Sequence, residues 1–171
     1  MIRISTGLKV AAASAVLLLV AACSSNKEAA GPGPGPTTTS NSSSSTILPG
    51  SAEDFRVNVG DTVHFEFNQY DIMDSDKGTL QRQATWLAKY PSVRVTIEGH
   101  CDERGTREYN LALGARRANA VKEYLVSVGV SSARVDTISY GKERPICTDS
   151  TEDCWAQNRR GVTTITGGAS S

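Results

Sequence analysis

One stretch of the sequence decides the fold: VRVTIEGHCDERGTREYNLALGARRANAVKEYLVSVG, residues 93–129. Its first six residues alternate apolar and polar side chains, which predicts a half-buried strand. A polar loop follows over residues 99–105, and Thr106 is a candidate N-cap for a long helix that Gly129 closes. The loop therefore lies at the carboxyl end of a strand, which is where open α/β sheets place their ligands.

The segments on both sides of this stretch show the same alternation of strand and helix periods. By their alternating side chains, three further segments are strand candidates: residues 62–67, 135–140 and 162–165. Asp74 is a candidate cap for a helix that Pro91 stops, and a short polar helix is expected over residues 155–160. The order β-α-β-α-β-(α)-β predicts an α/β sandwich, in which helices pack on one mixed four-stranded sheet.

The composition agrees with one domain of this class. The chain has 171 residues, and its 18 basic and 18 acidic residues give no net charge, which argues against nucleic acid as a partner. We assign the domain to residues 53–167 and a tail to residues 168–171. A domain of this size buries a core without the help of a metal or cofactor, and none is expected. After the first thirty residues no window of about 18 apolar residues predicts a membrane span.

The N-terminus has the layout of a secretory signal. Arg3 and Lys9 precede an apolar run over residues 10–20, and small residues lead to Cys23. The stretch before this cysteine resembles the bacterial lipobox, which implies cleavage after residue 22 and lipidation of Cys23. An ordinary signal with an incidental cysteine is the alternative.

A linker is expected between this signal and the domain, over residues 23–52. It contains the run Gly31-Pro32-Gly33-Pro34-Gly35-Pro36 and a row of serines, and such a composition cannot repay the entropy of ordering. Its root-mean-square span would be on the order of 30 Å. The segment would hold a domain close to a membrane and leave it free to move in the adjacent layer.

Arg117 occupies an unexpected place on the long helix. At 100° per residue it falls inside the apolar arc with Val121, whereas its neighbour Arg116 falls on the polar side. An unpaired guanidinium is costly to bury, so Arg117 must meet a carboxylate or face a cleft. Asp102 is the nearest candidate partner in the sequence. Two interpretations stay open from these residues: a closed structural ion pair, or a cleft in which both charges receive a zwitterion.

The loop and the helix resemble the OmpA-like peptidoglycan-binding domain over about residues 57–166. The resemblance rests on Gly99-His100-Cys101-Asp102-Glu103-Arg104-Gly105-Thr106, Tyr109-Asn110, Leu113, Arg116-Arg117-Ala118, Val121, Tyr124-Leu125, Gly129, Tyr140-Gly141, Pro145 and Asn158-Arg159-Arg160. With the lipobox and the linker in front, the whole chain resembles the lipoproteins of the Tol–Pal system.

This resemblance implies a ligand and a set of binding residues. The family's ligand is the meso-diaminopimelate of the peptidoglycan stem peptide, whose side-chain end is a zwitterion. The binding residues implied are Asp102, Arg117, Arg104, Asn110, Leu113, Phe67 and Asn68. Asn68 stands where the family has an aspartate, so this position lacks a charge. Arg159 and Arg160 are candidates for the pocket floor or, alternatively, for holding the last helix.

The resemblance also implies a cellular role. A lipid anchor at Cys23, followed by Ser24, favours the outer membrane, with the domain facing the periplasm. The expected partners are peptidoglycan, the outer membrane through the lipid, and Tol-system proteins such as TolB. The expected role is to attach the outer membrane to the cell wall, including during cell division.

The remaining cysteines lie in the domain. Cys147 and Cys154 bracket a polar loop, and a disulfide between them would contribute roughly 2–3 kcal/mol in an oxidising compartment. Pairing of Cys101 with Cys147 is the alternative that the sequence leaves open. Cys101 otherwise stands where the family more often has threonine or alanine, and a thiol is small enough for that position.

A lipid-anchored periplasmic enzyme acting on peptidoglycan is the alternative function. His100, Cys101, Asp102 and Glu103 are side chains that hydrolases and metal sites use, but consecutive residues on a loop rarely converge on one atom. The other histidine, His64, falls in a predicted strand. The sequence has no metal-ligand, nucleophile or phosphate-loop motif, so we expect a binding protein and not an enzyme.

Overall fold

The chain is represented by a computed structural model that describes residues 47–171. The predicted signal peptide at residues 1–22, the predicted lipidation at Cys23 and most of the predicted linker lie outside these residues. The described elements are, in order, α1 (Ala52–Asp54), the π-helix η1 (Phe55–Val59), β1 (Thr62–His64), α2 (Asp74–Lys89), β2 (Arg94–His100), α3 (Arg107–Ser127), the 3-10 helix η2 (Ser132–Arg134), β3 (Val135–Gly141), α4 (Glu152–Asn158) and β4 (Arg160–Gly167).

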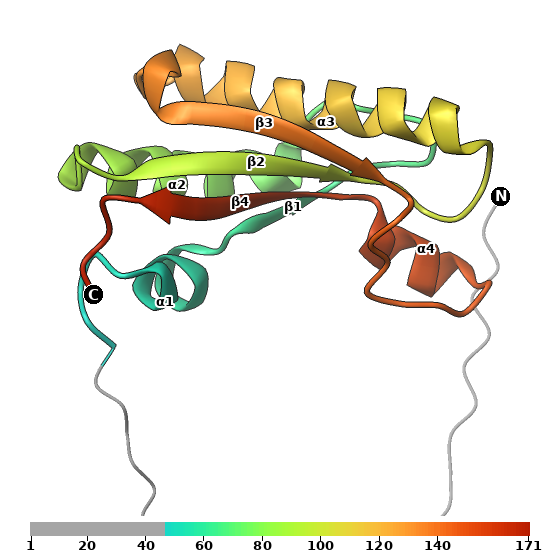
Figure 1. Cartoon of the computed structure of the whole chain (residues 1–171), viewed down its shortest axis with the longest axis horizontal. Helices are drawn as coiled ribbons and strands as arrows, with labels where there is room; N and C mark the ends of the chain where they lie inside the picture. The colour runs from blue at the N-terminus through green and yellow to red at the C-terminus, as the bar shows by residue number, and fades with distance from the viewer. Residues whose placement is uncertain (1–46) are drawn as a thin grey trace, which may run out of the picture. The chain divides into compact units, whose positions relative to one another are not determined.

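The four strands form one mixed sheet in the order β1-β4-β2-β3 (Figure 1). β2 and β3 are parallel, and β4 is antiparallel to both β1 and β2. The predicted α/β class and the mixed four-stranded sheet are therefore confirmed. Because β4 lies between β1 and β2, the end of the chain returns to the centre of the sheet, where Gly161 pairs with Gly99.

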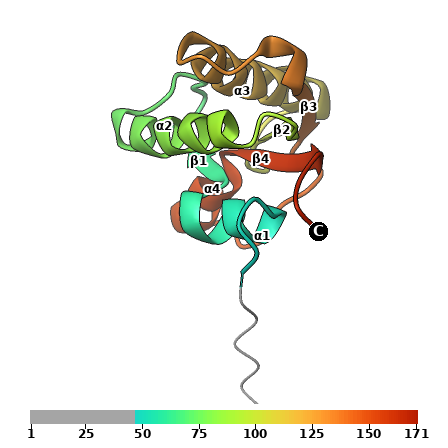
Figure 2. The ribbon, with the colours of Figure 1, turned by 90° about the vertical axis from the view of Figure 1, so that its left-hand side faces the viewer.

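Two long helices, α2 and α3, lie side by side over the sheet (Figure 2). The core between these layers is formed mainly by Leu80, Leu87, Val95, Ile97, Ala118, Val121, Leu125 and Val135. Figure 1 shows α4 beyond the carboxyl ends of β2 and β3. No helix formed by residues 47–171 combines the length and the apolar character that crossing a membrane requires.

Two glycines let α3 lie directly against the end of β2. A Cβ atom on Gly99 would lie 1.9 Å from the carbonyl oxygen of Gly114, and one on Gly114 would lie 2.3 Å from Ser139 Oγ. Only residues without a side chain allow this close backbone approach. The contact brings the N-terminal half of α3 against the loop that follows β2.

Both ends of α3 are as predicted. The Thr106 side chain accepts a hydrogen bond from Tyr109 N at 3.2 Å, which caps the first turn. Gly129 follows the last turn with a φ of 105°, and Val130 N donates to Leu125 O. The predicted long helix and its two caps are thus confirmed.

Other element boundaries differ from the predictions. Asp74 is the first residue of α2 and not its cap, because Met73 occupies the N-cap position without a side-chain bond. β1 ends at His64, three residues earlier than expected, because the chain turns away from the sheet after Phe65. α4 begins at Glu152, earlier than predicted, because Thr151 caps it.

The ends of the described chain contact each other. Ser170 N donates to Gly50 O at 3.0 Å, and Ser51 caps α1 by accepting a hydrogen bond from Asp54 N. Residues on both sides of the predicted domain limits, 53 and 167, therefore take part in the packed unit.

Candidate functional site

A cavity of about 230 Å³ opens where the loop after β2 meets the first turns of α3. Its lining residues are Phe67, Asn68, Cys101, Asp102, Arg104, Gly105, Tyr109, Asn110, Leu113 and Arg117. All seven residues that the family resemblance assigned to a ligand site are among them. They come from the turn after β1, the loop after β2 and α3, and the fold brings them together.

Arg117 is fully buried, as its position on the apolar arc predicted. Its guanidinium donates to three carbonyl oxygens, Gln69 O at 2.8 Å, His100 O at 2.8 Å and Glu66 O at 3.1 Å. Within residues 47–171 no carboxylate forms an ion pair with Arg117. The carbonyl groups accept from three of the five N–H donors of the guanidinium and leave its positive charge unneutralised. Burial lowers the pKa of Arg117, and the nearby Cys101 and Asp102 oppose this shift.

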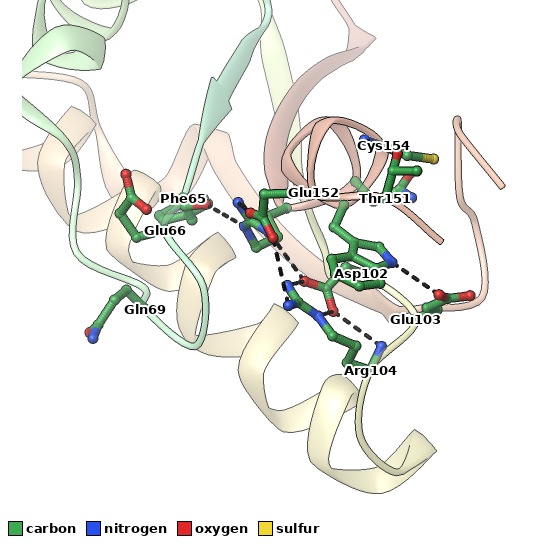
Figure 3. Close-up of polar contacts among 12 residues, drawn as sticks. Phe65, Glu66, Gln69, Asp102, Glu103, Arg104, Thr151, Glu152 and Cys154 are labelled. Carbon is green, nitrogen blue, oxygen red and sulfur yellow. Dashed lines mark hydrogen bonds and ion pairs between the residues drawn. The ribbon is translucent and has the colours of Figure 1, made fainter. Parts of the chain in front are cut away.

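Asp102 is also buried, with 4% of its surface exposed, but its partners are not those expected. Its carboxylate accepts hydrogen bonds from Arg104 N at 3.1 Å, Arg104 Nε at 3.2 Å and Arg104 Nη2 at 2.6 Å (Figure 3). Arg159 Nη1 lies 3.4 Å from the same carboxylate. Of the two interpretations left open by the sequence, the closed ion pair between Asp102 and Arg117 is not formed. Although burial raises the pKa of Asp102, the bonds to Arg104 hold it below its ordinary value.

Arg104 forms a wall of the cavity. Its guanidinium carbon lies 4.1 Å from the centre of the Phe67 ring and 4.0 Å from that of the Trp155 ring, so the cation is held between two aromatic faces. Hydrogen bonding to Asp102 raises the pKa of Arg104. Phe67 is 55% exposed and lies in the turn after β1, not at the end of the strand as predicted.

The two arginines of the C-terminal motif lie outside the cavity lining. Arg159 donates to Phe65 O at 2.9 Å, to Asp102, and to Glu152 Oε1 at 2.7 Å, so it supports Asp102 from behind. Arg160 reaches only carbonyl oxygens, those of Asn158 and Arg144. Of the two alternatives for these arginines, the pocket floor does not fit, and Arg159 fits the other, because it joins Glu152 of the last helix, α4, to the loop after β2.

The uncharged lining residues shape the cavity. Asn110 donates to Arg104 O at 2.8 Å and Thr106 O at 3.0 Å, which fixes the loop on α3. Asn68 has a φ of 59°, and its side-chain oxygen accepts a hydrogen bond from the hydroxyl of Tyr109. Tyr109 was not assigned to the site from the sequence. Its position one turn before Leu113 on the same helix was the signal that could have found it.

The described cysteines form one disulfide bond and leave one free thiol. Cys147 and Cys154 form a disulfide bond, and Cys101 is free and buried at the cavity, so the alternative pairing is not formed. Burial raises the pKa of the Cys101 thiol.

His100 Nε2 lies 3.5 Å from Glu98, but burial and the cations of Arg160 and Arg144 lower the pKa of His100 to about 4. The ring is therefore neutral near pH 7, and both of its nitrogens lack a hydrogen-bond partner in the described part.

The site is thus a small cavity with two cations and one anion among its lining residues. Among residues 47–171 no group of three or more histidine, cysteine, aspartate or glutamate side chains is arranged to hold a metal ion. The arrangement suits a ligand that presents a carboxylate to Arg117 and a positive group to Asp102.

Comparison with known proteins gives a consistent set of matches. Residues 64–159 match the model of the OmpA family. The peptidoglycan-associated lipoprotein of Rhizobium meliloti (strain 1021) is 59% identical over 123 residues, covering 72% of this chain and 69% of the relative. That of Pseudomonas aeruginosa is 52% identical over 99 residues, covering 58% of each chain.

Solved structures agree with the fold. The crystal structure of the peptidoglycan-associated lipoprotein from Burkholderia pseudomallei matches with a TM-score of 0.61 and 42% identity, covering 62% of this chain and 90% of that one. The periplasmic domain of Helicobacter pylori MotB matches with a TM-score of 0.55 and 20% identity, covering 63% of this chain and 71% of that one. At this identity the match supports only the fold.

Proposed function

Because the chain belongs to the OmpA family and, within it, to the peptidoglycan-associated lipoproteins, we propose that it binds peptidoglycan without a covalent bond. The part of peptidoglycan that it recognises is the diaminopimelate of the stem peptide. The side-chain end of this residue carries an ammonium and a carboxylate on one carbon, so it is a zwitterion.

The observation that carries the proposal is the state of Arg117. A guanidinium has five N–H donors, and Arg117 uses three of them on carbonyl oxygens, with Cys101 also close to the group, so at most two remain for a ligand. Its charge is buried, lines the cavity, and has no carboxylate partner within residues 47–171. A ligand carboxylate would both complete the hydrogen bonds and neutralise the charge.

Asp102 supplies the complementary charge. It lines the same cavity and its low pKa keeps it ionised near pH 7, so it can hold the ligand's ammonium. Its carboxylate already accepts bonds from Arg104 and Arg159, of which the contacts with Arg104 Nε at 3.2 Å and Arg159 at 3.4 Å are the longer. We expect the ammonium to share Asp102 with these two arginines by replacing one of the longer contacts.

The cellular role follows from the family and the sequence. The relatives' name supports a lipoprotein of the cell envelope. The lipobox at Cys23 supports anchoring in the outer membrane, with the domain facing the periplasm. Attachment of that membrane to the wall, with Tol-system proteins such as TolB as further partners and a role in cell division, rests on the family resemblance.

The proposal is tested by sedimenting the full chain, in detergent, with purified sacculi. Arg117→Ala and Asp102→Asn are expected to weaken binding by more than about tenfold, because each leaves a ligand charge without its partner. Arg116→Ala is the matched control, because Arg116 is exposed on the same helix outside the cavity, and it should bind like the wild type. Circular dichroism checks that each variant is folded.

A competition experiment needs no variant of the protein. A soluble stem peptide with diaminopimelate should displace the wild-type chain from sacculi, whereas the peptide with lysine at that position should not, because it keeps the ammonium and lacks the carboxylate. Equal displacement by both peptides would contradict the role of Arg117. We expect no soluble fragments to be released from the sacculi, and their release would favour the enzyme alternative.

A further inference from the structure

The short helix α4 contacts the charged wall of the cavity through two side chains. The Trp155 ring covers one face of the Arg104 guanidinium at 4.0 Å, and its Nε1 donates to Glu103 Oε1 at 2.9 Å. Glu152 Oε2 lies 3.7 Å from Arg104 Nη1. Figure 3 shows the contact between Glu152 and Arg104 beside the Asp102 carboxylate. None of the α4 residues lines the cavity.

These contacts close a ring of four charges behind the cavity. Arg104 contacts Asp102 and Glu152, and Arg159 contacts the same two carboxylates, at 3.4 Å and 2.7 Å. Glu152 therefore bridges both arginines that hold Asp102. Glu152 is distant from Asp102 in the sequence and lies outside the cavity lining.

The segment that carries Glu152 has little packing of its own. Residues 148–153 are all exposed, and a helix of seven residues is too short to be stable by itself. It is held by the Cys147–Cys154 disulfide and by Asn158, which accepts from Cys147 N at 3.2 Å and donates to Cys147 O at 2.7 Å. Cys154 is next to Trp155, so the cross-link sets where both contacting side chains lie.

We propose that the Cys147–Cys154 disulfide and α4 form a positioning device for the ligand site, in which Glu152 and Trp155 act through Arg104 on Asp102. Opening the disulfide frees the exposed segment, removes the Trp155 face from Arg104 and allows Asp102 to leave its binding orientation. Affinity then falls, because the cost of ordering these groups is met during binding and not during folding. The inference rests on the proposed function.

The first test compares affinities of the full, oxidised chain for purified sacculi. The double variant Cys147→Ala/Cys154→Ala and the single variant Trp155→Leu should each weaken binding by about three- to tenfold. Trp155→Phe should recover most of the loss, since a phenyl ring still covers the guanidinium. Gln157→Ala is the matched control on α4, because Gln157 bonds only to Asp153 O, and it should bind like the wild type.

The second test separates positioning from general stability. In an Arg104→Met background, where no guanidinium is left to position, Trp155→Leu and the double cysteine variant should change binding by less than about twofold. Equal losses in both backgrounds would mean that α4 acts only on stability, and this result would overturn the inference. If the double cysteine variant does not fold, the comparison of Trp155→Leu in the wild-type and Arg104→Met backgrounds tests the inference by itself.

The outcomes also distinguish the inference from the proposed function. Loss of binding in Asp102→Asn, with wild-type affinity in the disulfide and Trp155 variants, would refute the role of α4 and leave the function standing. A wild-type chain that does not bind sacculi would refute both.

Discussion

Arg117 is a buried cation that is bonded to carbonyl oxygens and not to a carboxylate of the described residues. A carboxylate partner would neutralise the guanidinium. The three carbonyl oxygens instead fix the position of the guanidinium without neutralising its charge. Leaving a charge without a counter-ion in a protein interior costs free energy, and the surrounding fold must offset this cost. At the scale of single residues, the distinguishing feature of the site is therefore that Arg117 has no carboxylate partner within residues 47–171.

His100 gives a prediction at the same scale. Its folded pKa of about 4 lies below its ordinary value of 6.5, so the unfolded chain binds more protons between these values. Stability is then full above about pH 6.5 and falls as the pH drops toward 4, by about 2 kcal/mol at pH 5. Urea denaturation at pH 7.5 and pH 5 should show this loss in the wild type.

The control for this prediction is His100→Gln, which does not titrate. Asp102 and Asp54 have lowered pKa values, so their contributions to stability are lost only at more acidic pH and do not mask the window between pH 7.5 and pH 5. A wild-type chain with the same pH dependence as His100→Gln would show that folding does not shift the pKa of His100.

At the scale of elements, the contact of α3 with β2 places the two halves of the site. Asp102 follows β2 and Arg117 belongs to α3, so the separation of their charges depends on how closely the helix lies on the strand. Gly99 and Gly114 set that approach. The periods of the sequence predicted both elements correctly, because alternation and helical repeats are local properties.

Gly99→Ala tests this contact. The added Cβ would lie 1.9 Å from Gly114 O, so the helix or the strand must shift, and we expect a loss of about 3 kcal/mol in the free energy of unfolding. Gly167→Ala is the matched control, because its Cβ would meet no atom within 4 Å, and it should change stability by less than about 0.5 kcal/mol. Urea denaturation measures both, and equal stabilities would contradict the argument.

At the scale of the whole molecule, the charge balance limits how the chain finds its ligand. With 18 basic and 18 acidic residues it has no net charge, so long-range attraction to a charged polymer is weak. In the proposed function we therefore expect the affinity to come from the cavity, where charges are buried and salt screens them less than at an exposed surface.

Salt dependence checks this conclusion. Raising the ionic strength from 0.05 M to 0.5 M should weaken binding of the full chain to sacculi by only about two- to fivefold, since a zwitterion and a buried pair are screened little. Sedimentation at the two salt concentrations measures the change. A loss of more than about a hundredfold would mean that exposed charges, and not the cavity, hold the polymer.

Local patterns in the sequence determined the order of strands and helices, the loop at the end of β2 and the burial of Arg117. The family motifs pointed to all seven assigned lining residues. Only the tertiary structure decided that Asp102 pairs with Arg104 and Arg159 and not with Arg117. The physical reason is that a helical period gives the direction of a side chain but not its distance from a loop. Likewise, Phe67 and Trp155 meet on Arg104 only because the turn after β1 and α4 fold to the same end of the sheet.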